Sequence, residues 1–143
     1  MNEFENYLTS LFEERLPSGV KDAMMYSLLN GGKRIRPRLL FAVLRAHGQK
    51  EEKGYATAAA IEMIHTYSLI HDDLPAMDDD TLRRGKPTCH VAFDEATAIL
   101  AGDGLLTMAF EIAAKASDDT KTALAIVLEC AKAAGFEGMI LGQ

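Results

Sequence analysis

Residue usage and spacing predict an all-α protein. Ala, Leu and Met make up 45 of the 143 residues, whereas Val occurs only four times, which follows helix propensity rather than strand propensity. Apolar side chains also recur at intervals of three and four residues, as in Phe4, Tyr7, Leu8 and Leu11, the spacing of one face of a helix. With 48% hydrophobic residues, a chain of this length can form one domain around a core.

Glycines, prolines and caps divide the chain into about six helices. Gly31 and Gly32 end the second helix, because glycine enters a left-handed cap without strain. Arg36 precedes Pro37, so we expect residues 33–36 to be extended or turn-like and Pro37 to open the third helix. The expected spans are about 2–15, 20–30, 37–46, 54–74, 89–115 (one helix, or two around Gly102-Asp103-Gly104) and 120 onward.

The last predicted helix has no clear end. Phe136, Met139, Ile140 and Leu141 still form an apolar pattern at the end of the sequence, without the polar tail typical of a natural C-terminus. No internal repeat or second-domain boundary is visible. We therefore expect residues 1–143 to be the N-terminal part of a single longer domain.

Composition disfavours several functional classes. The net charge of -6 and the absence of interleaved aromatic and basic residues argue against nucleic-acid binding. Cys89 and Cys130 are the only cysteines, too few for a disulfide framework. The N-terminus lacks a basic segment followed by an apolar run, and no uncharged stretch approaches the length of about 18 residues that a membrane span needs. We expect a cytoplasmic protein that does not span a membrane.

An acidic cluster ends the fourth predicted helix. Asp72, Asp73 and Asp78 lie close together in the sequence, where mutual repulsion and desolvation are costly without a cation. Mg²⁺ usually takes one or two protein carboxylates and leaves its other positions to water and phosphate. The cluster therefore predicts a magnesium site shared with a phosphate; a solvated acidic turn is the alternative.

A basic cluster follows the paired glycines. Lys33, Arg34, Arg36 and Arg38 lie within six residues, and the arginine fork together with the lysine point charge suits a diphosphate. A P-loop is excluded because its motif needs Ser or Thr where Arg34 stands. The cluster is thus a candidate anion clamp on a loop, with a solvated connection as the alternative.

His65 lies seven residues before Asp72. That separation is about two helical turns, so both side chains can face one cavity. His71 adjoins the carboxylates but is expected to point elsewhere. The spacing of the two histidines is not the i, i+4 arrangement of a zinc-binding helix.

Together these residues resemble the trans-isoprenyl diphosphate synthases, and within that family most closely the bacterial farnesyl diphosphate synthases. The matching segments, in order, are GGKRIRP at 31–37, HTYSLIHDDLPAMD at 65–78 and LRRGKPT at 82–88. Three ordered motifs are far more specific than any one of them. The resemblance implies the N-terminal half of an isoprenoid-synthase helical bundle.

The resemblance also implies a Mg²⁺-dependent prenyltransferase. It would condense isopentenyl diphosphate with dimethylallyl or geranyl diphosphate to form farnesyl diphosphate, through an allylic cation, attack by the isopentenyl double bond and proton loss. Asp72 and Asp78 would bind Mg²⁺ with Asp73 supporting them, and Arg83 would hold the allylic diphosphate. The residues implied to hold isopentenyl diphosphate are Lys33, Arg36, His65 and Arg84. The residues implied to be catalytic are Asp72, Asp73, Asp78, Arg83 and Arg84.

Product length can be argued partly from geometry. Tyr67 lies five residues before Asp72, about 7.5 Å along a helix axis at roughly 1.5 Å per residue, where its ring could close a tunnel for the growing tail. In the family, an aromatic residue here, followed by Ser68 and an aspartate motif with two extra residues, looks like the bacterial C15 type. Tyr67 as an ordinary core residue is the alternative.

The resemblance implies that the chain alone is incomplete. The family has a second aspartate-rich motif in its C-terminal half, and the 143 residues do not contain it, so we expect this chain alone to be inactive. Family members are typically homodimers. The alternatives are a geranylgeranyl diphosphate synthase and a non-catalytic diphosphate-binding or partner subunit. A terpene cyclase is disfavoured because residues 31–37 supply a second anion site.

Overall fold

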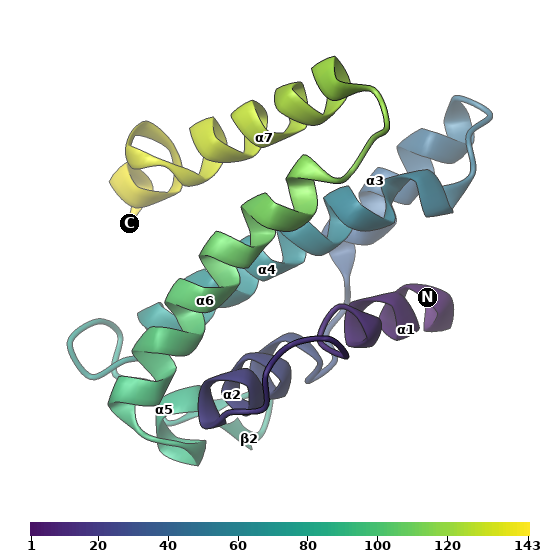
Figure 1. Cartoon of the computed structure of the whole chain (residues 1–143). Helices are drawn as coiled ribbons and strands as arrows, with labels where there is room; N and C mark the ends of the chain where they lie inside the picture. The colour runs from purple at the N-terminus through teal and green to yellow at the C-terminus, as the bar shows by residue number, and fades with distance from the viewer. The chain divides into compact units, whose positions relative to one another are not determined.

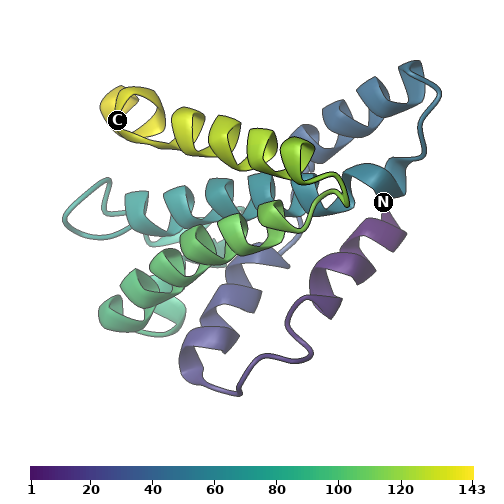
Figure 2. The same ribbon diagram turned by 45° about the horizontal axis from the view of Figure 1, so that its top comes forward.

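The computed structural model describes residues 1–143 and confirms the predicted all-α fold (Figures 1 and 2). It has seven α-helices, a short 3₁₀-helix, a π-helical turn and one two-stranded hairpin. The elements are α1 (Asn2–Ser10), α2 (Gly19–Leu28), α3 (Ile35–Ala46), η1 (Glu51–Gly54), α4 (Tyr55–Asp72), β1 (Leu82–Arg83), β2 (Lys86–Pro87), α5 (Cys89–Ala92), α6 (Glu95–Ala114), α7 (Thr120–Ala134) and η2 (Phe136–Ile140).

The chain forms two compact units. The first unit comprises Met1–Lys33 and His65–Leu106, and so contains α1, α2, the hairpin, α5 and one part each of α4 and α6. The second unit comprises Arg34–Ile64 and Thr107–Gln143, and so contains α3, η1, α7, η2 and the remaining parts of α4 and α6. Both long helices therefore run through both units.

Within the first unit, α2 packs against α6 where α6 has a glycine. A Cβ atom added to Gly104 would lie 3.0 Å from the Sδ atom of Met24, a core residue of α2. The alternative prediction of two helices around Gly102-Asp103-Gly104 is therefore wrong, since α6 continues through this segment. These glycines give room to neighbouring side chains rather than ending a helix.

The second unit is organised around α3, η1 and the start of α4. The Phe41 ring of α3 is 2% exposed and lies 5.5 Å from the ring of Tyr55. At the start of α7, the Asp119 carboxylate accepts a hydrogen bond from the Thr122 amide and so caps the helix. The helix ends at Ala134, which the sequence pattern did not indicate.

Two helix boundaries in the N-terminal third differ from those predicted. The first helix ends at Ser10 rather than near residue 15. The chain then continues through tight turns, one of which is closed by a hydrogen bond from the Phe12 amide to the Thr9 carbonyl. The third helix begins at Ile35, so residues 35 and 36 are helical and the extended conformation predicted for them is wrong. Pro37 is tolerated because amides of the first turn have no helical partner.

The region predicted as 89–115 is interrupted near its start. Phe93 and Asp94 separate the short α5 from α6. Asp94 ends the interruption, because its carboxylate accepts a hydrogen bond of 2.7 Å from the Thr97 amide and caps α6. An aspartate before a helical run was the sequence signal for this break.

By length and composition alone, α6 could cross a membrane. A core helix presents the same features, and 44% of the relevant stretch is buried inside the protein. Its buried residues include Ala98, Ala101 and Leu105, which are all fully shielded from solvent. The absence of a membrane span stays a prediction.

Candidate metal and anion site

The acidic segment after α4 folds back onto the end of that helix. The Asp78 amide donates a hydrogen bond of 2.7 Å to the Asp72 carbonyl, and the Asp80 amide donates one of 3.0 Å to the Asp73 carbonyl. Asp79 has a left-handed backbone, with φ at 54°, which an aspartate tolerates better than most residues. This turn brings Asp78 back beside Asp72. Their separation in the sequence alone does not require this proximity.

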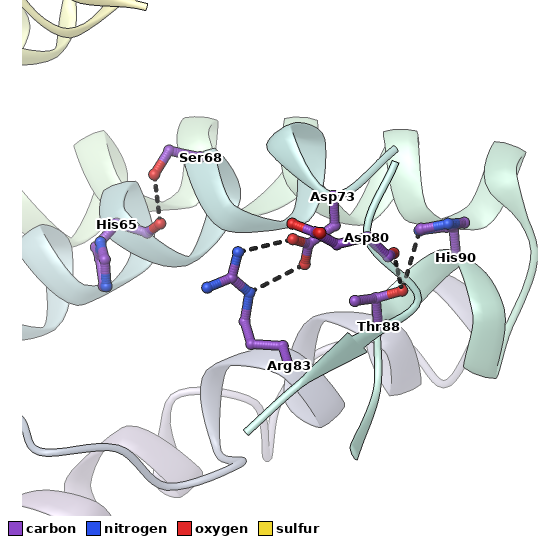
Figure 3. Close-up of polar contacts among 7 residues, drawn as sticks. All are labelled: His65, Ser68, Asp73, Asp80, Arg83, Thr88 and His90. Carbon is purple, nitrogen blue, oxygen red and sulfur yellow. Dashed lines mark hydrogen bonds and ion pairs between the residues drawn. The ribbon is translucent and has the colours of Figure 1, made fainter. Parts of the chain in front are cut away.

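Asp73 is held by Arg83 of the hairpin. Nη2 of Arg83 lies 2.7 Å from Oδ1 of Asp73 and Nε lies 3.1 Å from Oδ2 (Figure 3). The Asp73 residue is 3% exposed, and its hydrogen bond raises the pKa of Arg83. A fork of this kind is charge-assisted and directional. It joins the acidic segment to the hairpin and engages the Asp73 carboxylate, whereas no such fork is formed with Asp72 or Asp78, the two predicted metal ligands.

The electrostatics of Asp72 favour a bound cation. Burial, Asp78 and Asp73 raise the pKa of the Asp72 carboxyl, and Arg83 and His71 oppose that rise. No group of three or more His, Cys, Asp or Glu side chains is gathered into a metal cage. Two carboxylates suit Mg²⁺, which usually completes its octahedron with water and phosphate. The donor set therefore fits this metal together with a diphosphate.

The hairpin presents two arginines in different directions, and sequence reasoning missed it. Leu82 pairs with Pro87 and Arg83 with Lys86, while Arg84 and Gly85 form the turn with φ of 54° and 76°. Positive φ at both central residues is the geometry of a type I′ turn. Because of this turn Arg83 reaches Asp73, whereas Arg84 donates a hydrogen bond of 3.1 Å to the Gly31 carbonyl. Gly85 was the sequence signal.

The structure divides the basic cluster after Gly32. Arg34 is buried, has φ at 48° at the start of α3 and pairs with Glu62 of α4 at 2.9 Å. It is therefore engaged by the fold rather than exposed to a ligand. Lys33 and Arg36 are exposed, but Arg36 lies in the first turn of α3 and not on the predicted loop. Lys33 belongs to the first unit and Arg36 to the second.

His65 and Ser68 lie on different sides of α4. Figure 3 shows the His65 ring on the side where Arg83 lies, with Ser68 on the opposite side. The Ser68 hydroxyl donates a hydrogen bond of 2.6 Å to the His65 carbonyl, so it is bonded to its own helix. His65, Asp72, Asp73, Asp78, Arg83 and Arg84 all belong to the first unit.

Tyr67 packs against a histidine that sequence reasoning left without a role. Tyr67 is 6% exposed, and its ring packs edge to face against the His71 ring, with the ring centroids 5.5 Å apart. Nε2 of His71 lies 3.0 Å from the Ile99 carbonyl of α6. A Cβ atom on Gly102 would collide with the His71 ring. The glycine in α6 thus makes room for the histidine that supports Tyr67.

The polyprenyl synthetase family matches residues 17–141 of the chain. The chain belongs to the polyprenyl synthetase family. This match confirms the resemblance stated from the three motifs. It also agrees with the helical fold on which the acidic segment and the hairpin are built.

Individual polyprenyl synthetases are similar over almost the whole chain. The farnesyl diphosphate synthase of Bacillus subtilis (strain 168) is 55% identical over 144 residues, covering 97% of this chain and 48% of the relative. The heterodimeric geranylgeranyl pyrophosphate synthase large subunit 1 of Arabidopsis thaliana chloroplasts is 51% identical, covering 95% and 38%. The crystal structure of geranyltransferase from Legionella pneumophila superposes with a TM-score of 0.94 at 44% identity, covering 99% and 52%. The chain thus spans about half the length of the bacterial relatives it matches.

Proposed function

We propose that the protein is a prenyltransferase that condenses isopentenyl diphosphate with dimethylallyl or geranyl diphosphate to form farnesyl diphosphate. The observation that carries the proposal is the Arg83–Asp73 fork, which joins the acidic segment to the arginine hairpin within one unit. A diphosphate becomes a good leaving group only where cationic groups stabilise the charge that grows on it. Membership of the polyprenyl synthetase family supports this chemistry.

We assign one set of residues to the allylic diphosphate and another to isopentenyl diphosphate. Asp72 and Asp78 would hold Mg²⁺, which when bound neutralises charge on the allylic diphosphate as the carbon–oxygen bond breaks. Arg83, oriented by Asp73, would hold that same diphosphate. The residues proposed to hold isopentenyl diphosphate are Lys33, Arg36, His65 and Arg84. The reaction needs no nucleophilic side chain, since the isopentenyl double bond attacks the allylic cation and a proton then leaves.

Farnesyl diphosphate is the product that we favour. The bacterial relative that is 55% identical carries the name farnesyl diphosphate synthase, whereas the Arabidopsis relative is named for the longer geranylgeranyl product. The buried ring of Tyr67 lies on the helix that carries the aspartates. A C20 product is the second candidate, because a relative of 51% identity makes that class of product by name.

Tyr67→Ala is expected to lengthen the product from C15 to C20 or beyond, because truncating a buried ring opens space along α4. The product distribution would be read by mass spectrometry after incubation with isopentenyl and geranyl diphosphates and Mg²⁺. Tyr67→Phe is the control, in which an aromatic ring remains at the same position of α4. An unchanged C15 product from Tyr67→Ala would show that this ring does not limit the chain.

We further propose that residues 1–143 alone do not turn over, and that the whole protein acts as a homodimer in the cytoplasm. The curated and solved bacterial relatives are about twice as long as the matched region, which supports the need for further residues. A non-catalytic diphosphate-binding subunit is the alternative at this level.

The deciding experiment is incorporation of isopentenyl diphosphate into geranyl diphosphate with Mg²⁺. It would be run on the 143-residue chain and, in parallel, on the protein from the complete reading frame that encodes it. Turnover to C15 only in the latter supports the proposal in full. Turnover by the 143-residue chain would contradict its proposed inactivity. Binding of diphosphate by both proteins without turnover by either would favour the non-catalytic alternative.

A further inference from the structure

We propose that Tyr26, Asn30 and Gly32, around the end of α2, are positioning residues that hold the hairpin so that Arg84 and Lys33 form one preassembled anion site. The inference rests on the proposed function, since it assigns these residues to the isopentenyl diphosphate side of that site. Tyr26 and Asn30 lie outside the three motifs, and Gly32 lies inside the first of them without being a proposed ligand. Their role follows from what they contact.

Hydrogen bonds tie the hairpin to α2 and the loop after it at its turn and along β2. They run from Nη1 of Arg84 to the Gly31 carbonyl at 3.1 Å, from Nζ of Lys86 to Oδ1 of Asn30 at 2.6 Å, and from the Tyr26 hydroxyl to the Pro87 carbonyl at 2.7 Å. A two-stranded hairpin alone is marginally stable in water. Its position must therefore come from contacts of this kind with the rest of the first unit.

Gly32 is required sterically at the contact with Arg84. A Cβ atom there would lie 2.7 Å from Nη1 and 3.2 Å from Cζ of Arg84. The backbone φ of 124° also disfavours any residue with a side chain. The guanidinium consequently occupies the space that a side chain at position 32 would fill. Lys33 follows Gly32 directly in the sequence, so its backbone adjoins the glycine against which the Arg84 guanidinium rests.

Tyr26 is also held by a contact outside the hairpin. Its ring lies edge to face against Phe93, just after α5, at 5.5 Å, and α2 and α5 are in contact. The hydroxyl is thereby aimed at the Pro87 carbonyl. Holding Arg84 in place before the ligand arrives lowers the entropic cost of binding.

The anchors of the two hairpin arginines are separate. Arg83 is held by Asp73 at the end of α4, whereas Arg84 depends on the contacts with α2 and the glycine loop. Loss of the α2 anchors should therefore weaken the site of isopentenyl diphosphate and leave the allylic site intact. A residue with a merely structural role would affect both substrates and the stability of the fold.

The test compares Tyr26→Phe and Asn30→Ala with the original protein, using the protein from the complete reading frame. Tyr26→Phe removes a neutral hydrogen bond and Asn30→Ala removes a charge-assisted one. Neither substitution requires a change of backbone conformation. We expect the KM for isopentenyl diphosphate to rise by about 2- to 10-fold, with kcat, the KM for geranyl diphosphate and the thermal midpoint unchanged. Gly32→Ala is expected to raise the same KM further. Tyr7→Phe, which removes a hydroxyl from α1 of the same unit, is the matched control and should change neither KM.

A second measurement keeps the inference separate from the proposed function. Binding of inorganic pyrophosphate is measured by calorimetry in metal-free buffer, which reports on the basic site without the aspartates. If the protein shows no turnover, a loss of pyrophosphate affinity of about 2- to 10-fold in Tyr26→Phe and Asn30→Ala still supports the inference. A loss of this size corresponds to one hydrogen bond. Equal rises in both KM values, unchanged pyrophosphate affinity in the variants, or no pyrophosphate binding by the original protein would each overturn it.

Discussion

Glu62→Ala is expected to lower the free energy of unfolding by about 3–5 kcal/mol, because it removes the carboxylate that forms an ion pair with the buried Arg34 guanidinium. The side chains of Arg34 and Glu62 are each 5% exposed, and their ion pair spans 2.9 Å. Arg34 cannot easily turn to solvent, since its left-handed backbone at φ 48° starts α3 and its carbonyl accepts the first helical bond, from the Arg38 amide at 3.0 Å. Such a loss is a large fraction of the stability of an ordinary domain.

A double variant separates this electrostatic cost from a general loss of packing. Arg34→Gly combined with Glu62→Ala removes both charges, and glycine adopts the backbone of position 34 without strain. We expect the double variant to recover a substantial part of the loss in urea unfolding followed by circular dichroism. Glu51→Ala, which breaks the exposed pair with Arg45, is the control and should cost less than about 1 kcal/mol. Similar losses in Glu62→Ala and Glu51→Ala would contradict the assignment.

The helices were predictable where apolar periodicity and caps agreed. The segment that became α4 has continuous apolar spacing and ends near Pro75, and α7 begins after the Asp119 cap. Boundaries were wrong where a local rule had an exception. The rule that residues before proline avoid helix did not hold at Arg36, because Pro37 falls in the first turn of α3, where it breaks no hydrogen bond.

The types of the site residues were predictable, but their partners were not. The sequence shows that Arg34 is one of four neighbouring cations; it does not show that this one is buried. The signal was Glu62, a charged residue in the apolar run of α4, which requires a partner in the fold. Likewise, the sequence did not show that Arg83 bonds to Asp73 and Arg84 to the Gly31 carbonyl, because these contacts depend on a turn with positive φ.

Asp72→Asn is expected to weaken Mg²⁺-dependent pyrophosphate binding by about 10²-fold or more, since even residues that only support metal ligands are worth about 10- to 100-fold. The same substitution is expected to raise the thermal midpoint of the metal-free protein at neutral pH. Burial, Asp78 and Asp73 raise the pKa of the Asp72 carboxyl, so its ionised form is disfavoured in the folded state. The side chain thus costs stability where no cation is bound, and asparagine removes that cost.

The sign of the pH dependence tests this explanation. The folded state binds the Asp72 proton more tightly than the unfolded chain does, so the cost of ionisation is absent below the unfolded pKa of about 3.9 and grows as pH rises through the folded pKa. The gain in midpoint from Asp72→Asn should therefore be present at pH 7 and vanish near pH 4. Scanning calorimetry across this range would measure it, with the binding of Mg²⁺ and pyrophosphate followed by titration.

Asp79→Asn is the matched control for this prediction. It removes the same charge from the same acidic segment, and asparagine tolerates the left-handed backbone of position 79. Asp79 is exposed, so the substitution should change neither the midpoint nor the binding by much. A gain in Asp72→Asn that persisted at pH 4, or equal losses of binding in the two variants, would show that the segment acts through its total charge. A loss of binding confined to Asp72→Asn, paired with a pH-dependent gain in stability, would mean that the protein keeps a destabilising carboxylate at this position for the cation it binds.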